Sequence, residues 1–130
     1  MPNVETSTPA NAPGPIGPYS HIATAGSFIS ISATAGVDPV TGQLAGLDVA
    51  SQTQQILASF HAMLASVGSD LDHVVQVSVF LLRMSDFAAM NDAYAAGMGT
   101  HRPARTVIGV SALLKAGALV TMSLTAVMPD

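Results

Sequence analysis

Two arginines precede an apolar stretch near the end of the chain, and they need an anionic partner. Arg102 and Arg105 are two of only four Lys and Arg residues among 130, and the run TVIGV follows at residues 106–110. A guanidinium at the start of a buried strand is unfavourable unless an anion meets it. Because a guanidinium offers a planar fork to a carboxylate, the anion is either a protein Asp or Glu or a carboxylate ligand. The residues alone leave both possibilities open.

One histidine near the N-terminus could carry protons. His21 lies two residues after Tyr19, so an extended backbone here directs both side chains to the same side. Histidine titrates near neutral pH, which makes His21 a candidate proton carrier, and the alternative is a histidine at the surface or rim. The remaining histidines, His61, His73 and His101, show no metal-ligand spacing with Asp or Glu. We therefore expect neither a metal nor another cofactor.

Charged residues are scarce along the whole chain. They make up 9% of the residues, against about 25% in an average soluble domain. So little charge favours a surface that is partly covered by other copies of the chain. The net charge of −4 and the absence of a basic patch make nucleic acid an unfavourable partner. No cysteine is present, which excludes disulfides and thiolate nucleophiles.

The length of 130 residues predicts one domain. Residues 1–15 are rich in Pro, Ser, Thr and Asn, so we expect an extended N-terminal segment before a single domain at 16–130. This segment lacks the basic start and hydrophobic centre of a signal peptide, and no apolar run has transmembrane length. We expect a cytoplasmic protein that does not bind membranes.

Hydrophobic periodicity predicts two helices and four strands. Apolar residues recur at three- and four-residue steps after Asp48, and Gly68 ends this helix; a shorter helix follows Ser85 and Asp86 and reaches Met98. The strands are expected at 27–32, 74–82, 106–113 and 118–128. The order β, α, β, α, β, β predicts an α+β domain with helices on one face of a sheet.

Four motifs appear in a characteristic order: IGPYS (16–20), DPVTG (38–42), SDFAAMNDAY (85–94) and RPARTVIGV (102–110). With them the chain resembles the YjgF/Rid family of imine and enamine deaminases over about residues 11–128. The resemblance implies a chorismate-mutase-like α+β fold with two helices on one face of a mixed sheet. It also implies a homotrimer whose sheets form a central barrel, with clefts between neighbouring subunits. The implied substrate is a small carboxylate-bearing imine or enamine, which is hydrolysed to a keto acid and ammonium.

The resemblance assigns roles to three residues. Arg105 matches the arginine that binds the substrate carboxylate, which would supply the anion missing above. Tyr19 matches a tyrosine that lines the cleft, and Asn91 matches a helix asparagine associated with it. Arg102 remains a solvated charge at the rim.

Four positions depart from the family pattern. By the alternation of the last strand, Ser123 takes the place of a Glu that positions the attacking water. Val107 replaces a Cys, Gly109 stands where a Glu can occur, and Ala33 replaces a Gly. Ser123 and the backbone carbonyl of Val107 could still orient a water, but a serine alone cannot act as acid or base. His21 is therefore the candidate replacement. Besides a deaminase, the changes leave open a diverged enzyme that cyclises, isomerises or dehydrates a larger metabolite, and a non-catalytic metabolite-binding trimer.

Overall fold

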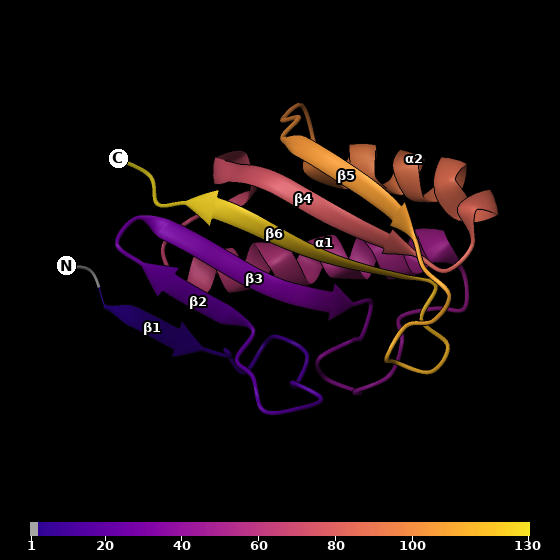
Figure 1. Cartoon of the computed structure of the whole chain (residues 1–130), viewed down its shortest axis with the longest axis horizontal. Helices are drawn as coiled ribbons and strands as arrows, with labels where there is room; N and C mark the ends of the chain where they lie inside the picture. Colours follow the sequence, from indigo (N-terminus) through magenta and orange to yellow (C-terminus); the bar gives the residue numbers. More distant parts are fainter. Residues whose placement is uncertain (1–2) are drawn as a thin grey trace.

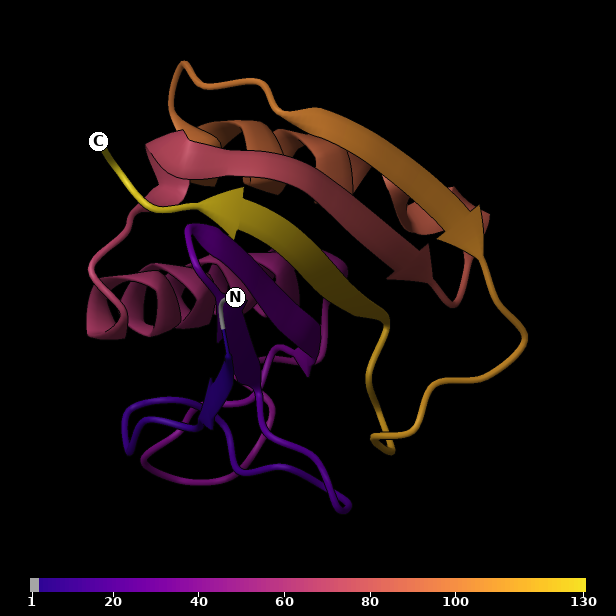
Figure 2. The same cartoon turned by 60° about the vertical axis from the view of Figure 1, so that its left-hand side comes forward.

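The computed structural model describes residues 3–130 as one six-stranded sheet with two helices packed on one of its faces (Figures 1 and 2). The strands are β1 (Val4–Ser7), β2 (Ile22–Ala25), β3 (Phe28–Ala35), β4 (Val74–Leu81), β5 (Ala104–Gly109) and β6 (Val120–Val127). The helices are α1 (Val49–Ser66) and α2 (Phe87–Met98), and short 3₁₀ turns cover Leu71–His73 and Met84–Asp86. Neither helix combines the length and the apolarity that a membrane span requires.

The strand order in the sheet is β1-β2-β3-β6-β4-β5. Only β4 and β5 run parallel, and α2 connects them, because parallel neighbours need a long crossover. The last strand of the chain, β6, therefore lies between β3 and β4. As Figure 1 shows, β3, β4 and β5 all have their C-terminal ends on the same side of the sheet, where β6 begins.

The sheet has one apolar and one polar face. On β6 the even-numbered residues from Val120 to Ala126 are buried, whereas Thr121, Ser123 and Thr125 lie half-buried on the opposite face. From α1, Ile56 and Phe60 pack fully buried against the apolar face. Both helices cover that face in Figure 2, and the Ser- and Thr-rich face carries no helix from residues 3–130.

The predicted α+β class and both helices are confirmed. Two short strands were not predicted: β2, and β1, which pairs with β2 at the sheet edge. Residues 4–7 of the expected N-terminal segment are thus extended but belong to the sheet, and residues 1–2 lie outside the described part. The strand expected at 106–113 begins earlier and ends at Gly109, because the chain turns away through a loop to Gly117, whose φ is +84°.

Gln52 of α1 holds two loops beside the ends of these strands. Its buried amide nitrogen donates to the carbonyls of Gly46 (3.1 Å) and Gly117 (3.2 Å), and its oxygen accepts from the backbone N–H of Leu119 (2.8 Å). Gly36 packs so tightly here that an added Cβ would lie 2.5 Å from the backbone oxygen of Gln52. Helix α1 therefore holds in place the loops beside the C-terminal ends of β3, β4 and β5.

Candidate functional site

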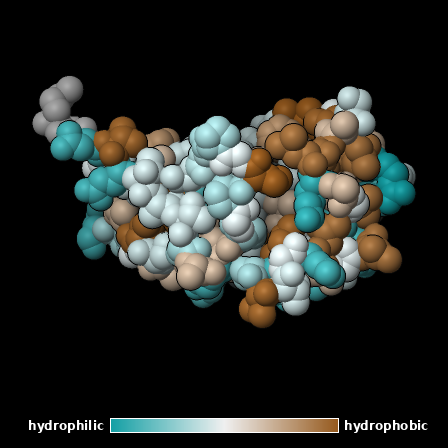
Figure 3. Space-filling model, turned by 90° about the horizontal axis from the view of Figure 1, so that it is seen from below, coloured by the Kyte–Doolittle hydropathy of each residue, from teal (hydrophilic) through white to brown (hydrophobic). Residues whose placement is uncertain are grey.

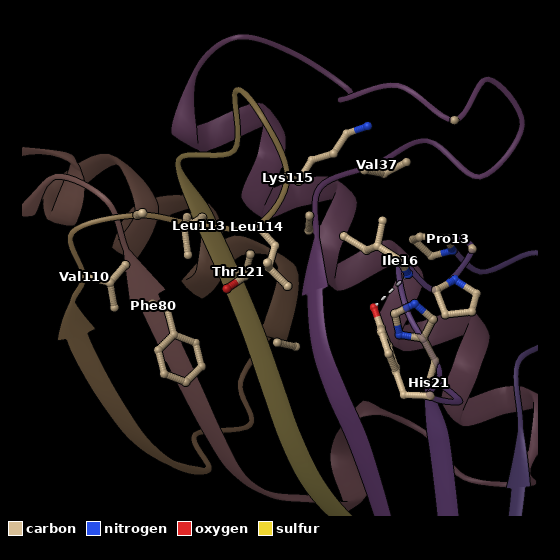
Figure 4. Close-up of a pocket in the computed structure, with 17 residues that line it drawn as sticks. Pro13, Ile16, His21, Val37, Phe80, Val110, Leu113, Leu114, Lys115 and Thr121 are labelled. Atoms are coloured by element: carbon tan, nitrogen blue, oxygen red, sulfur yellow. Dashed lines mark hydrogen bonds between the residues drawn. The ribbon is translucent and has the colours of Figure 1, made fainter.

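A cavity of about 550 Å³ opens where β3 and β4 end and β6 begins (Figure 4). Three stretches that are far apart in the sequence line it: the loop before β2, the end of β3, and the loop after β5. Among the residues singled out in the sequence, Tyr19, His21 and Ala33 belong to this lining. The cavity lies on the polar face of the sheet, because Phe80 and Thr121, which pair across β4 and β6, both line it.

His21 is buried, with 3% of its surface exposed, so the alternative of a surface or rim histidine is wrong. Its Nδ1 lies 2.9 Å from the hydroxyl of Ser32, and its buried Nε2 has no hydrogen-bond partner among residues 3–130. Burial lowers the pKa of His21, and the backbone groups of Gly14 and Pro13 oppose this in part. His21 is therefore neutral near pH 7 and keeps one ring nitrogen without a partner.

Tyr19 lies beside His21, as the two-residue spacing predicted. The two ring centroids are 5.5 Å apart in an edge-on arrangement. The phenol oxygen of Tyr19 accepts a hydrogen bond from the backbone N–H of Ile16 at 3.3 Å, the dashed line in Figure 4. Because Tyr19 is 38% exposed, it forms part of the outer wall of the cavity.

On β6, Thr121 lines the cavity and Ser123 does not. Both side chains lie on the same face, but Ser123 is one pleat further along the strand, opposite Ser78 of β4. The alternation of the sequence identifies the face of each residue but not its distance from the strand end. Thr121 is therefore the hydroxyl of β6 at the cavity, where the sequence analysis assigned Ser123.

Arg105 and Asn91 form a second group, between β5 and α2. The guanidinium donates to the Asn91 side-chain oxygen at 2.8 Å and lies over the Tyr94 ring, 4.7 Å from its centroid. Burial raises the pKa of the Tyr94 phenol, while the charges of Arg105 and Arg102 act in the opposite direction. No Asp or Glu within residues 3–130 forms an ion pair with Arg105. Since a guanidinium has five N–H donors, Arg105 retains donors for a ligand.

The two groups lie on opposite faces of the sheet. Arg105 pairs with Val77, which is buried under the helices, and Val107 on the same face packs against the core. Phe80 and Thr121 face the other side. One folded chain therefore does not bring the Arg105 guanidinium into the cavity that contains His21.

Arg102 has a different environment from Arg105. It is exposed, and its guanidinium donates to the backbone carbonyls of Gly99 and His101 just after α2. This agrees with a charge at the surface. Within residues 3–130, no cluster of three or more His, Cys, Asp or Glu side chains could hold a metal ion.

Comparisons with known proteins agree with this fold. The endoribonuclease L-PSP family model matches residues 9–128. A RutC family protein of Pyrococcus horikoshii is 44% identical over 105 residues, which is 81% of this chain and 83% of the relative. The human protein named 2-iminobutanoate/2-iminopropanoate deaminase is 38% identical over 106 residues, covering 82% and 77% of the two chains.

Solved structures show the same architecture. The YjgF gene product of E. coli superposes with a TM-score of 0.90 at 31% identity and covers 96% of this chain and 99% of its own. RidA from an Antarctic Psychrobacter also has a TM-score of 0.90, at 30% identity, with 95% and 99% coverage. The chain therefore belongs to the endoribonuclease L-PSP family, which is the YjgF/Rid family that its motifs resemble.

Proposed function

We propose that this protein hydrolyses a carboxylate-bearing 2-imino or 2-enamino compound to a 2-oxo acid and ammonium. The proposal rests on the surroundings of the Arg105 guanidinium. Its guanidinium is oriented by Asn91 and the Tyr94 ring, and it has no carboxylate partner within residues 3–130. A half-buried guanidinium of this kind fits a ligand carboxylate. Relatives named 2-iminobutanoate/2-iminopropanoate deaminase support this class of substrate.

We propose that the complete site forms between copies of the chain in a homotrimer. Arg105 and the cavity lie on opposite faces of one sheet, so the guanidinium of one copy would close the cavity of its neighbour. The scarcity of charge and the polar sheet face without a helix both favour such contacts. A chain that presents two different complementary surfaces forms a closed ring when the rotation between successive copies closes, as it would in a trimer.

The hydrolysis needs a water, a proton carrier and an oriented substrate. The water oxygen bonds to the imine carbon while a proton is added to nitrogen, which gives a tetrahedral carbinolamine. The C–N bond then breaks, the hydroxyl loses its proton to form the ketone, and ammonia leaves and is protonated to ammonium. Arg105 would fix the carboxylate, so that the adjacent carbon meets the water in one orientation.

His21 is the proposed proton carrier. It is neutral near pH 7, so it can accept the proton that the attacking water loses, and its Nε2 has no partner among residues 3–130. Thr121 at the cavity is suited to orient that water, with the backbone carbonyl of Val107 of a neighbouring copy as a second acceptor. Ser123, outside the lining, remains a weaker candidate for the same role.

Ribonuclease activity, which the family description mentions, is less well supported. The chain has a net charge of −4, and of its four Lys and Arg residues Arg83 is paired with Asp86 and Arg102 is bonded to backbone carbonyls. Tracking an RNA backbone requires several cations on one surface.

A coupled assay with imines generated in situ tests the proposal. The protein should accelerate the release of ammonia, and Arg105→Ala should lower kcat/KM by roughly 100-fold, since two charge-assisted hydrogen bonds contribute about 3 kcal/mol. Arg102→Ala is the matched control and should leave the rate unchanged. Binding of 2-oxo acids without any acceleration would contradict the deaminase and indicate a metabolite-binding protein.

A further inference from the structure

We propose that the cavity is a side-chain subsite for bulky apolar groups, so that the preferred substrates are 2-imino acids with branched aliphatic or aromatic side chains. This inference rests on the proposed function, because it names the substrate class of the same site. It concerns the wall of the cavity, whereas the proposed function concerns the carboxylate and the imine carbon.

The lining of the cavity is dominated by hydrocarbon. Ile16, Val37, Phe80, Val110, Leu113 and Leu114 all contribute to it. Figure 4 shows Phe80 and Val110 on one side and Ile16 with Pro13 on the other, with Leu113 and Leu114 between them. In Figure 3 hydrophobic surface gathers over the right half of the molecule, the side on which β3 and β5 end in Figure 1. An apolar ligand group is therefore the natural occupant.

The few polar groups of the cavity do not suit a charged substituent. No Asp or Glu lines it within residues 3–130. The one Lys or Arg side chain that lines it within residues 3–130, Lys115, extends along the rim and away from Phe80 and Thr121 in Figure 4. Tyr19, His21 and Thr121 supply hydrogen-bonding groups at the cavity wall, which fits one reacting centre rather than a polar tail.

The cavity of a single chain is larger than a small imine needs. Its volume of about 550 Å³ falls within the range of sites for drug-sized ligands, so space remains for a substrate side chain after a three-carbon imino acid and the Arg105 guanidinium of a neighbouring copy are placed in it. The end of β3 contributes only methyl groups, from Ala33 and Ala35, and both line the cavity. A larger residue at either position would take up the space that we assign to the substrate side chain.

The expected preference follows from apolar burial. Each buried methylene strengthens binding by about fourfold, so several added carbons should raise kcat/KM at least about tenfold over the alanine-derived imine. Ordering the flexible substrate side chain costs part of this binding free energy. The expected ratio of kcat/KM is therefore smaller than fourfold multiplied for every added carbon.

The test compares imines that an amino-acid oxidase makes from alanine, leucine and phenylalanine, using the full chain and kcat/KM as the readout. Equilibrium binding of the matching 2-oxo acids (pyruvate, 4-methyl-2-oxopentanoate, phenylpyruvate) is measured in parallel, because it does not require turnover. Ala35→Leu should remove most of the preference for the larger compounds and affect pyruvate least. Ala65→Leu, on the exposed side of α1, is the matched control.

A tenfold preference for the leucine or phenylalanine series that Ala35→Leu abolishes would support the subsite. Selective binding of the bulky 2-oxo acids without turnover of any imine would support it too, while rejecting the proposed deaminase. Equal or better use of the alanine-derived imine, with equal binding of pyruvate, would overturn it. So would a folded Ala35→Leu variant that keeps the full preference. If Ala35→Leu fails to fold, the wild-type series of substrates and 2-oxo acids decides the question.

Discussion

Replacing Gln52 with Leu removes three hydrogen bonds that hold the loops beside the cavity. The bonds to Gly46, Gly117 and Leu119 span 2.8–3.2 Å, and the side chain is fully buried. Leu has nearly the same volume, so the change isolates the polar contribution. A net hydrogen bond contributes about 1 kcal/mol, and the three bonds together predict a loss of about 3 kcal/mol in the free energy of unfolding. For a domain of this size that lowers Tm by roughly 10 °C.

Chemical denaturation and thermal melting measure this loss. Gln54→Leu on the same helix is the matched control, because Gln54 is exposed, and it should change stability by less than about 0.5 kcal/mol. The two loops should also exchange their amide hydrogens faster in Gln52→Leu than in the control. If Gln52→Leu unfolds within about 1 kcal/mol of the wild type, the three bonds do not hold the loops, and the reasoning is refuted.

Three further predictions concern packing and titration. Gly36→Ala should destabilise the fold by about 1–3 kcal/mol in a thermal melt, because the added Cβ would meet the backbone of Gln52. Gly14→Ala is the control and should be neutral, because nothing lies within 4 Å of its added Cβ. Equal melting temperatures of the two variants would show that the strand can shift. Burial lowers the pKa of His21 in the folded chain below its usual value of 6.5, so the unfolded chain binds the proton more readily and stability should fall as the pH drops below about 6.5. His21→Gln should reduce that slope, and an unchanged slope would assign it to other groups. Tyr94→Phe should alter stability by at most about 0.5 kcal/mol, because the phenol has no hydrogen-bond partner among residues 3–130; a loss above 2 kcal/mol would reveal one.

Much of the fold could be predicted because its central elements have strong periodicity. The apolar steps from Val49 to Leu64 and the alternation from Val120 to Ala126 match the buried faces of α1 and β6. The strands β1 and β2 were missed because each has only four residues and little hydrophobic alternation. β2 forms because β3 offers an edge to pair with, and β1 pairs in turn with β2. Such a tertiary cause leaves no local pattern in the sequence.

The site could be predicted only in parts. The motifs identified Arg105 and Asn91, and the structure places them in contact. The spacing of Tyr19 and His21 predicted their shared side, but the burial of His21 depends on the loop that contains Pro13, which folds over it. The cavity itself could not be predicted, because Phe80 and its other walls come from stretches that meet only after folding.

Arg105 and the His21 cavity lie on opposite faces of the sheet, so a variant can lose one half of the site and keep the other. If each cleft takes one face from each of two molecules, its formation is an association event, and the rate per chain should fall on dilution. Two inactive proteins, one without the guanidinium and one with a filled cavity, would then complement each other. In an equimolar mixed assembly about a quarter of the clefts would combine two intact faces.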